Sequence, residues 1–110
     1  ETATPQNFAL HQNYPNPFAP SARAHASSAT KIRYTLPLNA EVELAVFDLM
    51  GQRLATLVQS HKAPGLHTVE WNGKDEHGRL APSGIYFCRM RAVTDEGRNF
   101  QQVRRVLVLE

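Results

Sequence analysis

An alternation of apolar and polar residues with a period of two constrains the fold of this chain more than any other feature. In KIRYTL, residues 31–36, the side chains of Ile32, Tyr34 and Leu36 fall on one face, and polar side chains fall on the other. This is the period of a β-strand, in which successive side chains point to opposite faces of the sheet. No segment of the chain has the period of an amphipathic helix.

The alternation recurs in several other segments, which turn-forming residues separate. Val42, Leu44 and Val46 share the inner face of the next candidate strand, and Ala45 is predicted on its outer face. The segments predicted as strands are 31–36, 41–48, 53–58, 66–71, 84–93 and 100–109. Turn signals separate them at intervals of roughly 8–12 residues, and DEGR, residues 95–98, has the composition of a hairpin connection.

Six or seven short strands at this spacing predict an all-β fold. The prediction is an immunoglobulin-like antiparallel β-sandwich of about seven strands, not a barrel with a cavity. A sandwich has its core between the two sheets. We expect Trp71 to lie there, with Tyr86 or Phe87 close to it.

The length and composition agree with one folded domain. The chain has 110 residues, 42% of them hydrophobic, and can bury roughly two thirds of its unfolded surface. We expect a linker tail at residues 1–7 and the sandwich at 8–110, with a mobile Ala/Ser-rich loop at 19–30. The formal charge of +2 is too small to predict a nucleic-acid surface, so we expect an exterior of mixed charge. Cys88 is the only cysteine, which excludes an internal disulfide but leaves the redox compartment open.

The sequence has no candidate membrane span. No apolar run approaches the ~20 residues that cross a bilayer, and the longest, 103–109, is interrupted by Arg104 and Arg105. The opening residues, ETATPQN, lack the basic and apolar regions of a secretory signal. If the protein is exported, its targeting signal must therefore lie upstream in a longer precursor or elsewhere in the chain.

The residues that could support catalysis or hold a metal are scattered. The histidines have no metal-ligand spacing, and the one cysteine lies in a predicted core strand. No serine has a neighbouring base or a nucleophile-elbow sequence, and no glycine loop of the phosphate-binding type occurs. We therefore expect no enzyme activity, no catalytic or metal-binding residue and no cofactor.

The loop NGKDEHGR, residues 72–79, has two interpretations. Asn72, Asp75 and Glu76 are oxygen ligands that could bind calcium. Calcium takes about six to eight oxygens, and the loop offers about half of them. In the alternative, which we favour, Asp75 accepts backbone N–H groups and holds a tight turn in place.

Four arginines lie on two strands predicted to be neighbours: Arg89, Arg91, Arg104 and Arg105. If they shared a face, they would form a positive patch suited to an anionic partner. Like charges directly opposite each other are unfavourable, and a one-residue shift of register would change their pairing. An ordinary solvated face is therefore the alternative.

The segment QNYPNPF, residues 12–18, does not fit the strand pattern. Pro15 and Pro17 exclude a helix and a central strand, because each lacks an N–H and fixes φ. Tyr14 and Phe18 are nevertheless large aromatic groups that a linker would not need. We expect an irregular segment that packs onto the sandwich.

Four blocks carry a resemblance to a known family, in this order: QNYPNPF (12–18), IRYTLP (32–37), VELAVFDLMGQRLATLV (42–58) and PGLHTVEWNGKDEHGRLAPSGIYFCRM (64–90). Together they make the sequence from about Leu10 to Leu109 resemble the C-terminal sorting domain of proteins secreted by the type IX (Por) system. That family shares its immunoglobulin-like sandwich with a domain of flagellar hook-capping proteins. Ala19 stands here where the family typically has a further asparagine, and the loop after it is longer.

The resemblance implies roles for two sets of residues. The ending RRVLVLE is similar to the basic-then-aliphatic ending of sorting domains, which implies recognition by the export machinery through Arg104, Arg105, Val106, Leu107 and Val108. The alternative is that these residues complete the sheet. In the first block, the aromatics are implied to pack, the asparagines to bond backbone groups and the prolines to keep the edge from recruiting another strand. The residues of the implied structural motif are Asn13, Tyr14, Pro15, Asn16, Pro17, Phe18, Trp71, Asp75, Gly78, Gly84 and Tyr86.

The function implied by the resemblance is that of a non-catalytic sorting module. It would direct an upstream secreted protein through the type IX pathway to the cell surface or the medium. Its partners would be the outer-membrane secretion machinery and the passenger domain of the same precursor. One alternative is a carbohydrate-binding or spacer module of a secreted glycoside hydrolase, which exposure of Tyr14, Phe18 or Trp71 would favour. An enzyme is a second alternative, with no nucleophile, metal cluster or acid–base pair to support it.

Overall fold

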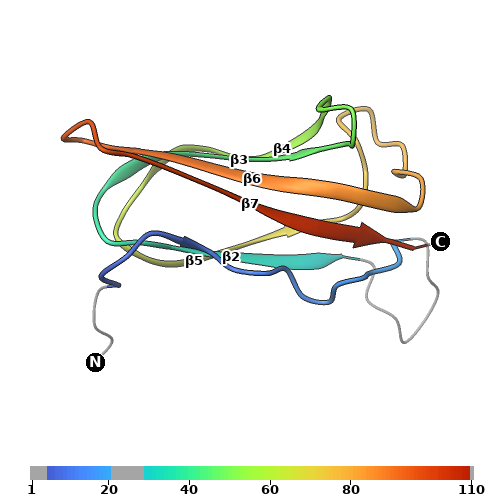
Figure 1. Ribbon diagram of the computed structural model, residues 1–110, viewed down its shortest axis with the longest axis horizontal. Coiled ribbons are helices and arrows are strands. Elements are labelled where there is room, and N and C mark those ends of the chain that lie inside the picture. Colours follow the sequence, from blue (N-terminus) through green and yellow to red (C-terminus); the bar gives the residue numbers. More distant parts are fainter. Residues whose placement is uncertain (1–4, 21–28, 110) are drawn as a thin grey trace.

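The computed structural model describes residues 5–20 and 29–109 of the chain. These residues form two antiparallel sheets packed face to face (Figure 1). The strands are β1 (Ala9–Leu10), β2 (Thr30–Leu36), β3 (Ala40–Phe47), β4 (Arg53–Lys62), β5 (Gly65–Trp71), β6 (Gly84–Thr94) and β7 (Asn99–Val108). The described residues contain seven strands and no helix, which confirms the predicted all-β sandwich.

The strands are divided between a three-stranded and a four-stranded sheet. The first has the order β1-β2-β5 and the second the order β4-β3-β6-β7. In Figure 1, β3, β4, β6 and β7 lie above β2 and β5. Strand β6 is central in its sheet, as expected from its aromatic and branched residues, and β7 is an edge strand.

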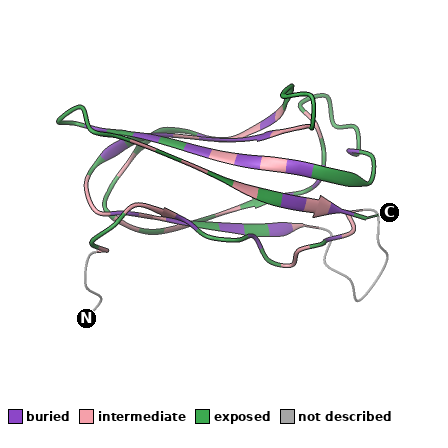
Figure 2. Cartoon of the chain, viewed as in Figure 1, coloured by how far each residue is buried: buried purple, intermediate pink, exposed green. Residues whose placement is uncertain are grey.

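The core lies between the sheets and follows the predicted alternation, which is visible as alternating buried and exposed segments along the strands (Figure 2). Trp71 is 1% exposed and is the largest fully buried side chain. Its ring makes edge-on contacts with Phe18, at a centroid distance of 5.6 Å, and with Tyr86, at 5.9 Å. The expectation of Trp71 in the core, close to Tyr86, is therefore met.

Two details of the strands differ from the sequence prediction. Ala45 lies on the outer face of β3 but is fully buried. Its register partners are Arg89 on β6 and Thr56 on β4, and its methyl group is shorter than either of these side chains. Strand β4 also continues past the predicted end to Lys62, where it pairs with Ala40. The added residues are mostly polar because β4 is an edge strand, so they show no apolar alternation.

The structure tests the prediction for the cysteine but covers only part of the predicted linker tail and mobile loop. Residues 1–4 of the predicted linker tail and residues 21–28 of the predicted mobile loop lie outside the described residues, so those two assignments stay predictions. Cys88 is a buried free thiol on β6. Burial raises the pKa of this thiol to about 12, so it stays protonated and unreactive near neutral pH.

Candidate functional site

The segment QNYPNPF, hereafter the strap, joins the two sheets along one edge of the sandwich. Tyr14 exchanges two backbone hydrogen bonds with Lys31 of β2, at 2.9 and 2.8 Å. Four residues later, the Phe18 N–H donates to the Leu107 carbonyl of β7 at 3.0 Å, and the Phe18 carbonyl accepts from Leu109 at 2.9 Å. The strap therefore starts on the three-stranded sheet and ends on the four-stranded one (Figure 1).

Side-chain amides of the strap bond the outward backbone groups of β7. The Asn16 Oδ1 accepts from the Leu107 N–H at 2.8 Å, and the Gln12 Nε2 donates to the Arg105 carbonyl at 2.7 Å. The Asn16 Nδ2 lies 3.4 Å from the same carbonyl. An edge strand normally leaves such groups free to pair with another chain, and here the strap uses them.

Inside the strap, Asn13 is the buried polar residue. Its Nδ2 donates to the Thr30 Oγ1 at 2.8 Å and to the Pro15 carbonyl at 3.3 Å, and the Thr30 hydroxyl donates to the same carbonyl at 2.8 Å. The Tyr14–Pro15 and Asn16–Pro17 peptide bonds are both cis.

The expectation that both strap aromatics pack is correct for Phe18 and wrong for Tyr14. Phe18 is 2% exposed, whereas Tyr14 is 77% exposed. The reason is the alternation along the strap. Where Tyr14 pairs with β2 through its backbone, the neighbouring Asn13 occupies the inward position and the phenol ring points to solvent.

Strand β7 is also fastened to β1 by two side chains. The Leu10 N–H donates to the Gln102 Oε1 at 2.9 Å, and the Arg104 Nε donates to the Leu10 carbonyl at 2.7 Å. These bonds satisfy the two Leu10 backbone groups. Arg104, a candidate for recognition, therefore has a structural contact.

The other terminal candidates divide by face. Val106 and Val108 are buried in the core, at 0% and 2% exposure. Arg105 is exposed and Leu107 half-buried on the outer face of β7, and Leu109 is exposed just beyond the strand. Of the five predicted residues, only Arg105 and Leu107 have side chains that point outward and make no side-chain hydrogen bond to another element in the described part of the chain.

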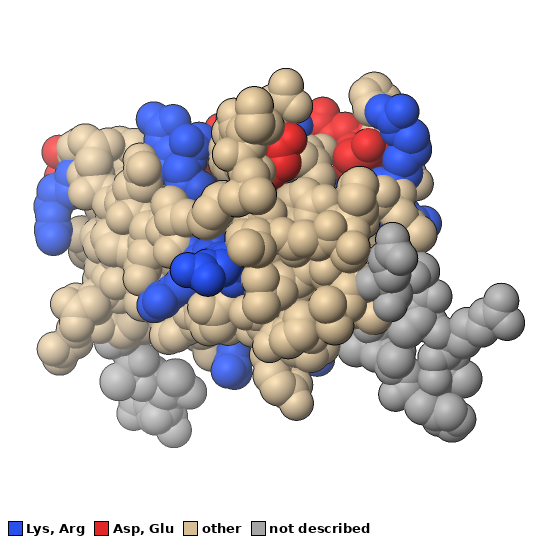
Figure 3. Space-filling model, turned by 45° about the vertical axis from the view of Figure 1, so that its right-hand side comes forward, with Lys and Arg blue, Asp and Glu red and all other residues tan. Residues whose placement is uncertain are grey.

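The four arginines of the predicted patch do not share one face. Arg104 pairs with the buried Cys88, so it belongs to the inward-facing row, while Arg105 pairs with Phe87 on the outer face. Adjacent residues of a strand must point to opposite faces, which is why Arg104 and Arg105 separate. Figure 3 shows Lys and Arg side chains at several separate places on the visible face, as expected for a mixed-charge exterior.

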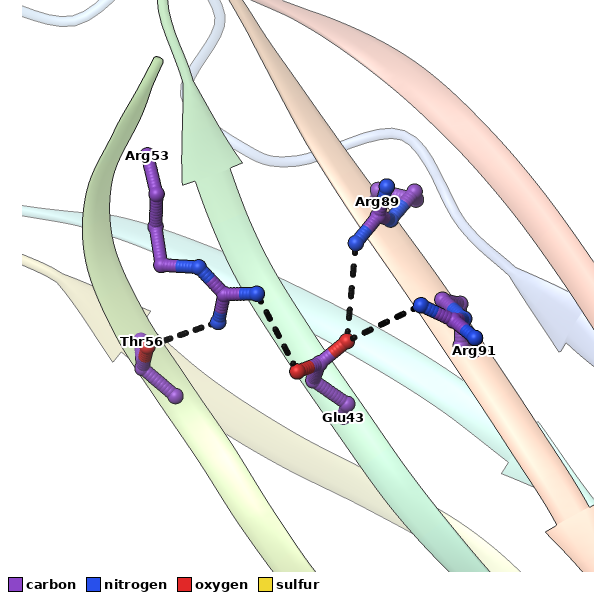
Figure 4. Close-up of polar contacts among 5 residues, drawn as sticks. All are labelled: Glu43, Arg53, Thr56, Arg89 and Arg91. Carbon is purple, nitrogen blue, oxygen red and sulfur yellow. Dashed lines mark hydrogen bonds and ion pairs between the residues drawn. The ribbon is translucent and has the colours of Figure 1, made fainter. Parts of the chain in front are cut away.

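Arg89 and Arg91 instead join a group that the sequence analysis did not identify. On the outer face of the four-stranded sheet, they point toward Glu43 of β3 together with Arg53 of β4 (Figure 4). The nearest nitrogens of Arg53, Arg89 and Arg91 lie 3.2, 3.5 and 3.8 Å from the carboxylate oxygens. We call Glu43, Arg53, Arg89 and Arg91 the arginine cluster. No sequence motif marks it, because its members come from three strands.

The loop after β5 has the structural form that we favoured over calcium binding. The Asp75 Oδ1 accepts from the backbone N–H groups of His77 at 2.8 Å and Arg79 at 3.0 Å. The Arg79 backbone hydrogen bond is the main cause that lowers the pKa of Asp75, helped by the His77 bond and the Arg79 charge. No group of three potential metal-binding acidic, histidine or cysteine side chains occurs in residues 5–20 and 29–109.

The remaining motif residues lie around the same end of the core. Gly78, at φ +80°, donates its N–H to the Asp75 carbonyl at 3.1 Å. Gly84, at φ +151°, opens β6, and the buried Tyr86 donates its hydroxyl to the Pro82 carbonyl. The Trp71 Nε1 donates to the Lys74 carbonyl at 3.0 Å. With Trp71 and Phe18 buried, the aromatic platform expected of a carbohydrate-binding module is reduced to Tyr14.

Comparison with protein families gives a match over most of the chain. The model for the FlgD Ig-like domain matches residues 19–96, more than half of the sequence. The chain belongs to the FlgD Ig-like domain family. This is a non-catalytic structural domain, and the match agrees with the immunoglobulin-like sandwich described above. No curated protein matches the chain significantly in sequence.

Solved structures share the fold of this FlgD Ig-like domain at low sequence identity. FlgD from P. aeruginosa superposes with a TM-score of 0.59 at 22% identity, over 72% of this chain and 61% of that one. Latent dimeric PorU from Porphyromonas gingivalis superposes with a TM-score of 0.66 at 14% identity, over 93% of this chain and 9% of that one. PorZ from the same organism is described as an essential surface component of the type-IX secretion system. It superposes with a TM-score of 0.54 at 18% identity, over 94% of this chain and 11% of that one.

These likenesses establish the fold alone. The domain corresponds to about three fifths of the FlgD chain and to a small fraction of PorU and PorZ. In the described part of the domain, no helix has the length and apolarity needed to cross a membrane.

Proposed function

We propose that this FlgD Ig-like domain is a non-catalytic sorting module that directs an attached secreted protein through the type IX secretion pathway. The attached protein would reach the cell surface or the medium. The partners would be the outer-membrane secretion machinery and a passenger domain of the same precursor. Recognition would use exposed side chains of the terminal strand, with no bond chemistry.

Two findings support the proposal. The four sequence blocks from 12–18 to 64–90 resemble those of sorting domains in the same order. Among the structures with the same fold is PorZ, a surface component of that secretion system. At 18% identity, the likeness to PorZ shows a shared fold, and the association with secretion is what the experiment below tests.

The observation that carries the proposal is the arrangement of β7. The strap and the Arg104–Leu10 bond hold this strand in place while Arg105 and Leu107 face outward and Leu109 follows, 51% exposed. A basic and two aliphatic side chains are thus displayed where the Arg105 carbonyl, the Leu107 N–H and carbonyl and the Leu109 N–H already have hydrogen-bond partners. A receptor can read them without unfolding the sandwich.

The experiment fuses the domain behind a reporter protein in a bacterium that has the type IX pathway. The unmodified fusion should carry the reporter to the surface or the medium. The double variant Arg105→Glu with Leu109→Ser should retain most of the reporter in the cell, because both changes alter exposed side chains. Deleting residues 104–110 is a poorer test, since it also removes the buried Val106 and Val108.

Arg98→Glu is the matched control. Arg98 is exposed at the other end of the β6–β7 pair, so the same charge reversal should leave release unchanged. Thermal unfolding of each purified variant checks that the sandwich is intact. Normal release of the double variant would refute the recognition role of the terminal strand, and retention of the unmodified fusion would refute the sorting function.

A second candidate function is that of a structural spacer, which the FlgD family match favours. A spacer holds neighbouring domains apart and carries no export information. It predicts that the unmodified fusion stays inside the cell and that exposed changes on β7 have no effect on localisation.

A further inference from the structure

The arginine cluster contains more positive than negative charge. Glu43 is the one carboxylate within 4.0 Å of the Arg53, Arg89 and Arg91 guanidinium groups among the described ion pairs. Burial acts to raise the pKa of Glu43, but the Arg53 hydrogen bond and the three arginine charges lower it below its ordinary value. Glu43 is therefore ionised near neutral pH and balances one of the three positive charges of the cluster. The next carboxylate on this face of β3 is the exposed Glu41, which lies opposite Val93.

The guanidinium groups of the cluster are incompletely hydrogen-bonded. A charge-assisted N–H···O bond is typically about 2.7–2.9 Å long, whereas the contacts to Glu43 measure 3.2, 3.5 and 3.8 Å. The Arg89 Nε is buried and has no hydrogen-bond partner in the described part of the chain. Arg91 has a side chain that is 55% exposed. Arg91 thus retains exposed N–H donors for an additional oxyanion, whereas the Arg89 Nε is out of reach of a ligand.

The positions of the guanidinium groups are held before any ligand arrives. The Arg89 and Arg53 groups lie 4.5 and 5.4 Å from the centroid of the Phe47 ring, within the range of cation–π attraction. Arg53 also donates to the Thr56 Oγ1 at 3.0 Å. Side chains that are already ordered lose less conformational entropy when they bind.

The neighbouring residues indicate the chemical class of the partner. Val93 follows Arg91 on the outer face of β6 and is 42% exposed, and Val103, opposite Arg89 on β7, is 46% exposed. A polyanion such as a nucleic acid or sulfated glycan would leave these valines uncovered. A protein segment with both carboxylate and apolar side chains would cover the valines and neutralise the arginines.

The spacing on β6 indicates the conformation of that segment. Arg89 and Arg91 are two residues apart on one face, which is about 7 Å along a strand. Carboxylates at alternate positions of an extended chain have the same spacing and would lie over both arginines. We propose that the outer face of the four-stranded sheet binds an extended acidic segment of another protein, with carboxylates on the arginine cluster and apolar side chains on Val93 and Val103.

This surface adjoins the terminal strand's recognition residues, because Arg105 follows Val103 on the same face of β7. Its test nevertheless needs only the purified domain. The probe is a short blocked peptide of the pattern Asp-Ser-Asp-Ser-Leu, in which both Asp side chains and the Leu side chain point to the same face of the extended chain. Binding is followed by backbone and arginine side-chain NMR signals at low ionic strength. Chemical-shift changes should concentrate on β3, on β6 and on the arginine Nε–H signals, and affinity should fall as salt is raised.

Charge-reversal variants test whether the peptide binds at the arginine cluster. Arg91→Glu should weaken binding about tenfold or more, since it removes one attraction and adds one repulsion. Arg33→Glu makes the same change at an exposed position on the outer face of the three-stranded sheet and should leave affinity unchanged. The NMR spectrum of each variant shows directly whether the fold is kept.

Three results would overturn the proposal. One is an absence of peptide-induced shifts at the cluster. Another is an equal loss of affinity in Arg91→Glu and Arg33→Glu, which would mean a general charge effect. The third is tighter binding of a short heparin fragment than of the peptide at the same site, which would identify a polyanion surface instead.

Discussion

At the scale of single residues, Gly73 has the strictest requirement for its side chain. It lies in the loop after β5 at φ +79°, a conformation that residues with a Cβ rarely adopt. A Cβ placed there would be 2.5 Å from the Cγ and 2.6 Å from the Cβ of Pro20. The glycine therefore allows the loop to approach the chain just after the strap.

Gly73→Ala should lower the free energy of unfolding by about 2–4 kcal/mol, because it adds a backbone conformational cost to an overpacking cost. Chemical denaturation of the purified domain measures the loss.

Gly78→Ala is the control for the backbone cost alone. Gly78 has nearly the same φ, +80°, but nothing lies within 4 Å of an added Cβ. Its loss should be about 1–2 kcal/mol. Equal losses in the two variants would show that the Pro20 contact has no energetic weight.

At the scale of elements, the strap covers the free edge of β7 although it is not itself a strand. Its two prolines lack N–H groups, so it cannot form a continuous ladder. It bonds β7 through the Asn16 and Gln12 side chains and, at Phe18, through the backbone. The edge of the four-stranded sheet is thereby closed over residues 105–109 by an irregular segment.

Asn16→Ala should destabilise the domain by about 1–2 kcal/mol, since it leaves the partly buried Leu107 N–H without its acceptor. Amide hydrogen exchange at Leu107 should become faster, and denaturation gives the change in stability.

Asn16→Asp retains an acceptor oxygen at the same place, and it replaces the Nδ2, 3.4 Å from the Arg105 carbonyl, with a second carboxylate oxygen. Exchange at Leu107 should therefore stay close to that of the unmodified protein. If Asp accelerates exchange as much as Ala does, the Asn16 Oδ1 is not the group that protects Leu107.

At the scale of the whole molecule, one aromatic cluster connects the strap to both sheets. Trp71 ends β5, Tyr86 lies on β6, and Phe18 comes from the strap. Because all three are buried in the same core, the strap contributes to the stability of the sandwich as a unit.

Phe18→Ala should cost about 3–5 kcal/mol, the usual range for emptying a buried phenylalanine site. Tyr14→Ala, in the same motif but exposed, should stay within about 0.5 kcal/mol of the unmodified protein. Denaturation curves of the two variants provide the comparison. Similar losses at both positions would contradict the burial of Phe18 and the exposure of Tyr14.

All strands except the two-residue β1, together with most of their faces and the core tryptophan, could be predicted from the sequence. The reason is that a period of two is a local property: Ile32, Tyr34 and Leu36 must share a face once their segment is extended. Turn residues are local as well, so the limits of β2, β5 and β6 were predicted to within one residue. The unpredicted end of β4 is polar, where the pattern carries no signal.

Only the tertiary structure decided which side chains lie opposite one another on neighbouring strands. Whether Arg104 or Arg105 joins the outer face depends on which of them pairs with the inward Cys88, and that follows from the register of two distant strands. The meeting of Glu43 with Arg53 and Arg89 likewise requires three strands to be aligned. Period-two patterning by itself determined which side chains face inward, whereas the pairing of strands determined which charges meet, because register is set by turns, bulges and packing across the whole sheet.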